Sequence, residues 1–172
     1  MAGAVTVGRG RPANAPTVQR VARAAWHAAY DHLLGAGTVQ QRVASWFDPD
    51  RLAEDDLLPD ERPFLVAVDD RLVGVAEAVP RDGNYHLHRP YVHPDRWREG
   101  IGSRLLEGVT AAVRGRGADR LTVSVVDGGP AVAFYGESGL ERVGEGYDDA
   151  FDLPRYDYVL ELSAVPPSST DR

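Results

Sequence analysis

The stretch VHPDRWREGIG, from Val92 to Gly102, joins a predicted strand to a predicted helix. It passes through a proline and a charged turn and reaches two glycines directly before SRLLEGV, which has helical periodicity. The start of a helix presents unpaired backbone N–H groups, and glycine lets an anion approach without a Cβ in the way. The pattern therefore predicts a phosphate-binding turn at Gly100 and Gly102, with Arg98 and Ser103 as further donors. On spacing alone, glycines that only satisfy the geometry of a helix entry fit equally well.

The segments on either side of this turn alternate between strand and helix patterns. Strands are predicted at 5–9, 64–68, 72–79, 85–92, 120–126, 141–146 and 156–162, and helices at 18–33, 39–47, 101–114 and 130–138. Residues 48–63 form a proline-bounded acidic connection. The strand, helix and strand between residues 85 and 126 predict a crossover with parallel strands, while the shorter connections before it predict antiparallel pairs. The expected fold class is α/β, with a mixed sheet (α+β) covered by helices on both faces.

Length and composition fit one domain. With 172 residues, of which 43% are apolar, the chain can bury one sizeable core. We expect a single domain over residues 1–162 and a disordered tail over SAVPPSSTDR, residues 163–172. No apolar run approaches the roughly 20 residues that span a bilayer, and the N-terminal sequence lacks the apolar core of a signal peptide. These features predict a soluble cytoplasmic protein without a membrane partner.

The charged residues and the missing residue types exclude several kinds of chemistry. The chain carries 26 acidic and 19 basic residues, and every basic one is arginine. Without lysine there is no Schiff-base catalysis, and without cysteine there is no disulfide, thiolate metal site or thiol nucleophile. The net charge of −7 argues against a nucleic-acid partner and favours cationic small molecules.

Two separated motifs stand out in the sequence: LHRPYVHPDRWREGIGSRLL, residues 87–106, and AVAFYGESGL, residues 131–140. Together they resemble the GCN5-related N-acetyltransferase superfamily. In that family a V-x-P step ends the fourth strand, a Q/R-x-x-G-x-G/A loop grips the pyrophosphate of acetyl-CoA, and a later helix carries A-x-x-F-Y. The resemblance covers residues 64–162, and AAWHAAY (residues 24–30) is similar to the first helix of polyamine-type members.

The resemblance implies acetyl-CoA as co-substrate and assigns its binding site. The strand end is expected to splay at a bulge near Pro90, so that its free backbone groups pair with the pantetheine arm. Trp97 occupies the Q/R position and Arg98 follows it, which shifts the guanidinium by one place. The Glu99 carboxylate is expected to point to solvent. The predicted cofactor-binding residues are Tyr91, Val92, His93, Arg98, Glu99, Gly100, Ile101, Gly102 and Ser103.

A further departure lies in the second motif, where Gly128 replaces an asparagine that often opens it. A cofactor contact or a helix cap is therefore either missing or supplied by Asp127.

The resemblance also implies catalytic roles. By motif position Tyr135 is the general acid that protonates the departing thiolate, although Phe134 and Tyr135 taken without the motif fit core residues. An amine with a pKa near about 10.4 must lose a proton, and the candidate bases are Glu77, His86 and His88. Both histidines also fit neutral, packed residues. A zinc ion shared by His86 and His88, with His93 nearby, lacks a third ligand at a suitable spacing, so no metal is expected.

Two acidic runs are predicted to border the acceptor site. Residues 54–61 follow the first helices and residues 145–152 join the last two strands. If both line the cleft, it would attract a cation. The predicted activity is direct acetyl transfer from acetyl-CoA to a primary amine of a small, polyamine-like cation. The alternatives are a protein or peptide N-terminal acetyltransferase with an open cleft, and a non-catalytic acyl-CoA-binding regulatory module; a homodimer is possible.

Overall fold

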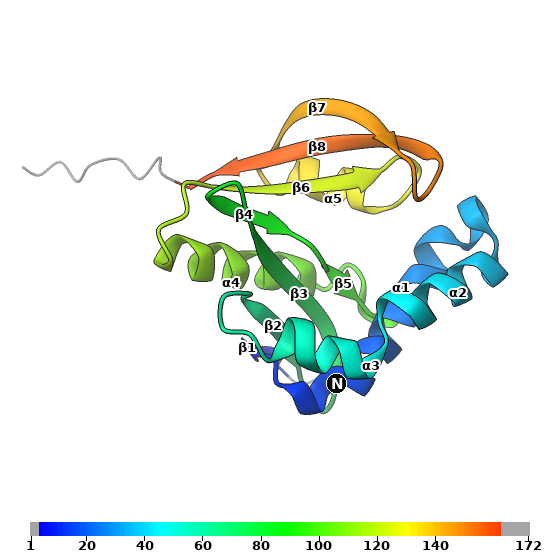
Figure 1. Cartoon of the computed structure of the whole chain (residues 1–172), viewed down its shortest axis with the longest axis horizontal. Helices are drawn as coiled ribbons and strands as arrows, with labels where there is room; N and C mark the ends of the chain where they lie inside the picture. The colour runs from blue at the N-terminus through cyan, green and yellow to red at the C-terminus, as the bar shows by residue number, and fades with distance from the viewer. Residues whose placement is uncertain (1–3, 163–172) are drawn as a thin grey trace, which may run out of the picture.

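The computed structural model describes residues 4–162 (Figure 1). The predicted tail at 163–172 lies outside the described residues. The helical elements are η1 (Pro12–Asn14), α1 (Ala15–Leu34), α2 (Ala36–Trp46), α3 (Pro49–Arg51), η2 (Leu52–Leu57), η3 (Pro94–Arg96), α4 (Ile101–Gly115) and α5 (Ala131–Glu137). The strands are β1 (Thr6–Arg9), β2 (Phe64–Val68), β3 (Leu72–Arg81), β4 (Asn84–Leu87), β5 (Tyr91–Val92), β6 (Arg120–Val126), β7 (Glu141–Asp148) and β8 (Leu153–Glu161).

These strands form one mixed sheet in the order β1-β2-β3-β4-β6-β8-β7, and β5 pairs with β3. The pairing of β4 with β6 is parallel, at Tyr85↔Leu121 and His86↔Thr122, which confirms the predicted crossover. The other pairs are antiparallel. Asp82 and Gly83 connect β3 to β4 with φ angles of 51° and 80°, as a two-residue hairpin of the primed type requires.

The strand predicted at 85–92 is broken, and this break opens the sheet. β4 pairs with β3 up to Leu87↔Ala78, and pairing resumes only at Tyr91↔Val75. Three residues, 88–90, thus lie opposite two on β3, and Pro90 has no N–H to give to a ladder. Beyond the break β5 departs from β6 instead of continuing beside it (Figure 1). The prediction of one continuous strand was therefore wrong, whereas the predicted bulge is present.

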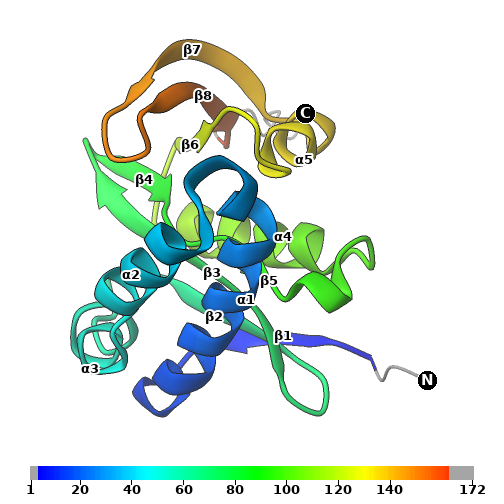
Figure 2. The ribbon, with the colours of Figure 1, turned by 90° about the vertical axis from the view of Figure 1, so that its right-hand side faces the viewer.

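Helices cover both faces of the sheet, as predicted (Figure 2). Val66 and Val75 belong to a core with α1 and α2, whereas Ala67 and Ala76 belong to a core with α4 and α5. Alternating side chains of one strand therefore serve two cores. Gly74 lets α4 approach closely, because a Cβ there would lie 2.9 Å from Leu105.

Two connections differ from the predictions. The acidic connection at 48–63 contains α3 and the π-helical turn η2, whose Leu52 and Leu57 are buried in the core under α1. The apolar spacing of these leucines was the signal for it. The last two strands are longer than predicted, so half of the acidic run at 145–152 lies within β7. None of the helices in the described part of the chain is long and apolar enough to cross a membrane.

Candidate functional site

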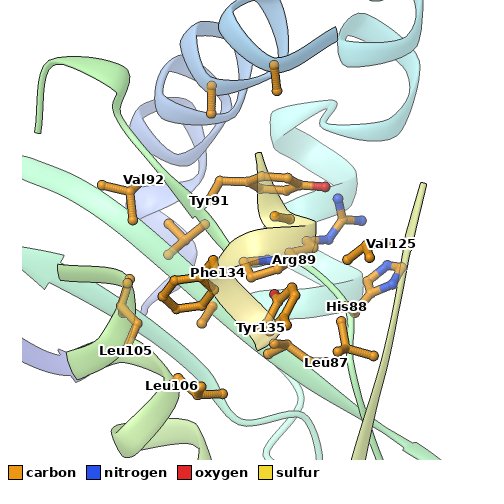
Figure 3. Close-up of a pocket in the computed structure, with 18 of the residues that line it drawn as sticks. Leu87, His88, Arg89, Tyr91, Val92, Leu105, Leu106, Val125, Phe134 and Tyr135 are labelled. Carbon is orange, nitrogen blue, oxygen red and sulfur yellow. The ribbon is translucent and has the colours of Figure 1, made fainter. Parts of the chain in front are cut away.

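A cleft of about 1670 Å³ occupies the opening between β5 and β6. Its walls come from α1, η2, the β4–β5 segment, the start of α4, β6, α5 and the β7–β8 turn. Figure 3 shows Phe134 of α5 on the side of Val92 and Leu105, and the neighbouring Tyr135 ring close to Leu87 of β4. The splay of the sheet therefore brings together residues that are more than a hundred positions apart in sequence.

The predicted phosphate-binding turn forms the start of α4. Gly100 is the N-cap residue with φ 82°, and Arg98 also has a positive φ of 68°. None of the described side chains caps this N-terminus, so the N–H groups of the first turn face a potential ligand. A Cβ on Gly102 would lie 3.4 Å from the Phe134 ring and 4.0 Å from Val92, which bound the space above the turn. The residues present thus fit an anionic group followed by an apolar arm.

The charges around this turn are arranged so that Glu99 does not oppose an anion. Arg96 donates from Nε to the Glu99 carboxylate at 2.9 Å and also binds Asp69. Glu99 is exposed, in agreement with its predicted orientation, and its charge is paired. Arg98 and Ser103 are exposed and line the cleft, and Ile101 is buried beneath it.

Among the three residues predicted at the strand end, Val92 directs its backbone groups into the opening. The His93 N–H donates to the Val73 carbonyl at 2.8 Å. This bond shows which residues of the antiparallel pair point their main-chain groups at the partner strand, because such residues alternate along a strand. Tyr91 and His93 therefore direct their main-chain groups toward β3, and Val92 directs its own toward the cleft. The Val92 carbonyl accepts from the Trp97 indole at 2.8 Å, which leaves the Val92 N–H for a ligand. The His93 ring caps η3 by accepting from the Asp95 N–H.

Tyr135 lines the cleft although only 1% of the residue is exposed. Its ring packs against Phe134, with centroids 5.1 Å apart, and Tyr158, at 6.2 Å. Burial, followed by the neighbouring hydroxyls of Tyr91 and Tyr30, raises the pKa of Tyr135. The phenol is therefore protonated at neutral pH and can act as a proton donor to the cleft.

The two predicted histidines both line the cleft, in different environments. His86 is buried and its Nδ1 lies 2.7 Å from the Thr122 hydroxyl. Burial and then the charge of Arg81 lower the pKa of His86 to about 4. His88 is more exposed, and desolvation in the cleft and the Arg89 charge lower its pKa to about 4. Both rings are neutral at neutral pH. Within residues 4–162 no group of three potential ligands could hold a metal ion.

Glu77 lies in a buried charge network beside the cleft. Arg89 donates from Nε to Glu77 at 3.1 Å, Arg62 lies 3.6 Å from it, and none of the Glu77 carboxylate is exposed. Asp56 pairs with Arg62 at 2.6 Å and with Arg89 at 3.4 Å. Burial and then the Asp56 charge raise the pKa of Glu77 to about 8, against the two arginines.

This network ties three segments together at the break in the sheet. Asp56, Arg62 and Arg89 line the cleft, whereas Glu77 is not among the described lining residues. Arg89 also donates to the Trp46 carbonyl at the end of α2. Because Glu77 lies behind the cleft wall and bonds to Arg89, its position favours a role in holding Arg89 rather than in direct contact with an amine. Sequence analysis gave Asp56 only as a member of the acidic run at 54–61, and it missed Arg62 and Arg89, although Arg89 lies directly in the predicted bulge.

An aromatic cluster, also missed by sequence analysis, lines the α1 side of the cleft. Trp26 is at its centre, with ring centroids 4.9 Å from Tyr30 and 6.2 Å from Tyr91. The spacing of the first two as a helical pair was visible in the sequence, but their partners come from other elements. The aromatic cluster consists of Trp26, Tyr30, Trp46, Phe47, Tyr91 and Phe151.

The glycines that open the second motif allow α1 to contact the β6–α5 loop. Gly128 has φ 91°, and a Cβ on it would lie 3.1 Å from Leu33. A Cβ on Gly129 would lie 3.3 Å from the Tyr30 ring. α5 follows Pro130 without a cap from any described side chain, so Asp127 does not supply a helix cap. The glycine that replaces asparagine is therefore explained by close packing of α1.

The two acidic runs contribute unequally to the cleft. Glu54, Asp55, Asp56 and Glu61 line it, which agrees with the prediction for the first run. From the run at 145–152, the only acidic residue among the described lining residues is Asp148. Its carboxylate accepts from the Phe151 N–H at 3.0 Å and so shapes the β7–β8 turn.

Replacing Gly102 by valine is expected to raise the dissociation constant of coenzyme A by about tenfold or more, equivalent to about 1.4 kcal/mol. The new side chain would fill the space between the first turn of α4 and the Phe134 ring. Isothermal titration measures the affinity. Gly115→Val is the matched control, because Gly115 lies at the exposed far end of α4, where an added Cβ would meet no described atom within 4 Å apart from its chain neighbours and the backbone of its own helix. Equal affinities in both folded variants would remove this assignment.

Comparisons with known proteins agree with this geometry. Residues 26–140 match the profile of the Acetyltransferase (GNAT) family. No curated protein matches the chain. Among solved structures, the PaiA N-acetyltransferase from Thermoplasma acidophilum, in complex with coenzyme A, is 18% identical with a TM-score of 0.82, covering 92% of this chain and 99% of that one.

Two further structures share the fold at similar identity. An aminoglycoside 6'-N-acetyltransferase complexed with coenzyme A is 19% identical with a TM-score of 0.68, covering 94% of this chain and 99% of that one. The ribosomal-protein-S18-alanine N-acetyltransferase from Escherichia coli is 14% identical with a TM-score of 0.68, covering 98% and 100%. At these identities the similarity concerns the fold.

Proposed function

The chain belongs to the GNAT acetyltransferase family, and on that premise we propose that it transfers an acetyl group from acetyl-CoA directly to the primary amine of a small, polyamine-like cation. The observation that carries the proposal is the cleft itself, which joins the uncapped start of α4 to the buried hydroxyl-bearing ring of Tyr135. Acetyl-CoA would supply the activated thioester. The remaining chemistry falls to the chain's own residues.

The cofactor side of the cleft binds through backbone groups in this proposal. The N–H groups around Gly100 and Gly102 receive the phosphates, with Arg98 and Ser103 at the edge. The Val92 N–H orients the amide arm, because it directs its hydrogen into the opening. The fixed helix start and strand edge hold the reacting end near α5 without a large rearrangement.

Proton transfer is assigned to groups whose protonation states fit. Tyr135 holds a proton at its hydroxyl at neutral pH and donates it to the departing sulfur. Of the three predicted bases, His88 lines the cleft with an exposed side chain, and its low pKa keeps it neutral. The same low pKa makes His88 a weak base, so the proton passes on to water. The positions of His86, bonded to Thr122, and of Glu77, held by Arg89, support positioning roles.

The acceptor side carries carboxylates that can attract a cation. Glu54, Asp55, Glu61 and Asp148 line the cleft and form no ion pair with a described residue, whereas the side chains of Arg62 and Arg89 are bound by Asp56 and Glu77. The aromatic cluster adds ring faces, which attract cations as well as alkyl chains.

Asp148→Asn is expected to raise the KM for a cationic acceptor by roughly threefold or more while kcat changes little. Asparagine retains the oxygen that accepts from Phe151 but removes the charge. The effect on KM should shrink as salt screens the field. Asp149→Asn is the control, since Asp149 is exposed and does not line the cleft. If the KM changes neither with the substitution nor with ionic strength, the result would contradict a cationic acceptor.

A panel of acceptors tests the proposed activity. Purified protein and acetyl-CoA are combined with polyamines, aminoglycosides, amino acids and peptides with free N-termini, and release of free thiol is followed. We expect turnover with the linear polyamines. Turnover with peptides alone would identify a protein N-terminal acetyltransferase, and tight binding of coenzyme A without turnover on any amine would identify a non-catalytic module.

A further inference from the structure

An aromatic ring from the β7–β8 turn bridges the two sides of the cleft. Phe151 stacks on Trp26 of α1, with ring centroids 5.5 Å apart and an angle of 29° between the planes. It also lies 5.4 Å from the Tyr30 ring and 6.2 Å from the Trp46 ring. The hairpin belongs to the C-terminal half of the sheet, whereas α1 and α2 cover the N-terminal half (Figures 1 and 2). Phe151 therefore closes the cleft on the hairpin side.

The Arg42 side chain already packs against one side of the Trp46 and Phe151 rings. The Arg42 guanidinium lies 5.2 Å from the Trp46 ring centroid and 5.3 Å from that of Phe151. Trp46 and Phe151 line the cleft, but Arg42 is not among the described lining residues. Arg42 thus contacts the Trp46 and Phe151 rings from outside the cleft. The ring surfaces that remain for a ligand are those directed into the cleft.

The chemistry of this end of the cleft combines apolar ring surface with one carboxylate. Asp148 precedes Phe151 by three residues in the same turn and lines the cleft beside it. Its charge is close enough to Tyr30 of α1 to contribute to raising the pKa of that hydroxyl, after burial and Tyr91. Methylene groups can pack on the rings of Trp26 and Tyr30, and a terminal ammonium group can pair with Asp148.

We infer that Phe151 is a specificity-determining residue, whose ring limits the length of the linear alkyl diamines that the cleft accepts. The inference rests on the proposed acetyl transfer to a cationic amine and adds to it the shape of the acceptor and the residue that ends the cleft. A diamine of fitting length would place one nitrogen near Tyr135 and His88 and the other near Asp148. A longer chain would meet the stacked rings of Phe151 and Trp26.

Phe151→Ala is expected to shift the preferred chain length upward. The probes are a homologous series of linear α,ω-diamines with acetyl-CoA, and kcat/KM is measured for each from thiol release. Removing the ring should raise kcat/KM for the longest diamines, which the ring excludes, and change it little for the shortest, which end before they reach the ring. The ratio of long to short should rise by about tenfold or more, the discrimination that a methylene-sized change in an apolar pocket provides.

Two variants keep this test decisive. Tyr147→Ala removes an exposed ring from the same hairpin outside the cleft and should leave the length profile unchanged. Phe151→Leu keeps an apolar contact and should shift the length profile in the same direction as Phe151→Ala, but by a smaller amount. This variant provides the test if the alanine variant does not fold. Equal changes at every chain length, or an unchanged profile, would overturn the inference while the proposed function stands. A wild-type protein inactive on every amine would overturn both.

Discussion

Replacing Tyr135 by phenylalanine is expected to lower kcat by about 10²-fold or more, with little change in the affinity for coenzyme A. The substitution keeps the ring that packs against Phe134 and Tyr158 and removes the hydroxyl. Burial holds the proton on this hydroxyl at neutral pH, so its loss removes a proton donor rather than a charge. Steady-state kinetics with a saturating amine, titration with coenzyme A and thermal unfolding are measured on one preparation.

Tyr158→Phe is the matched control for this prediction. Tyr158 is also buried, its ring lies next to that of Tyr135, and its hydroxyl accepts from Arg142 outside the main cleft. Losing that hydrogen bond should cost about 1 kcal/mol of stability and leave kcat almost unchanged. A folded Tyr135→Phe protein that behaves like the control would exclude Tyr135 as an essential acid. The thiolate would then have to leave through water.

Local patterns in the sequence were sufficient to predict most of the fold. The helix at 101–114 and the strand at 120–126 were predicted within a residue of α4 and β6, because their apolar spacing and bounding glycines are local signals. The glycines at 100 and 102 likewise marked a helix start that can be read without knowing what surrounds it. The parallel pairing of β4 with β6 followed from the single helix between them.

The parts that were missed depend on contacts between distant segments. The family resemblance predicted a bulge near Pro90, but the extent of the break at 88–90 is set by how β3 pairs with β4 and again with β5, and a strand pattern with one proline does not specify that register. The aromatic cluster joins α1, α2, β5 and the β7–β8 turn. Asp56 was predicted only as one charge of the acidic run at 54–61, but η2 turns it inward to meet Arg62 and Arg89.

That buried network gives the largest expected loss of stability. Glu77→Ala is expected to lower the free energy of unfolding by about 1.5–3 kcal/mol, because it removes a buried group that accepts a hydrogen bond from the Arg89 guanidinium and leaves that donor without a partner. Arg89 is largely buried and also holds the end of α2, so the wall of the cleft should loosen with it. Urea unfolding measures the change. A loss below about 1 kcal/mol, the median for exposed pairs, would contradict this picture.

Glu77→Gln separates a positioning role from that of a base. Glutamine resembles the protonated acid, keeps an oxygen for Arg89, and should retain most of the stability and kcat, whereas loss of a catalytic base would lower kcat by about 10²-fold or more.

Because the pKa of Glu77 is raised from 4.5 to about 8, the folded protein holds a proton that the unfolded chain releases at lower pH. The stability that this proton contributes is complete below about pH 4.5 and is lost as the pH rises through about 8. Wild-type protein should therefore lose stability relative to Glu77→Gln across that range, by up to about 1.4 kcal/mol per pH unit. Parallel stability curves, or a gain for the wild type with rising pH, would mean that Glu77 is ionised throughout and balanced by Arg62 and Arg89.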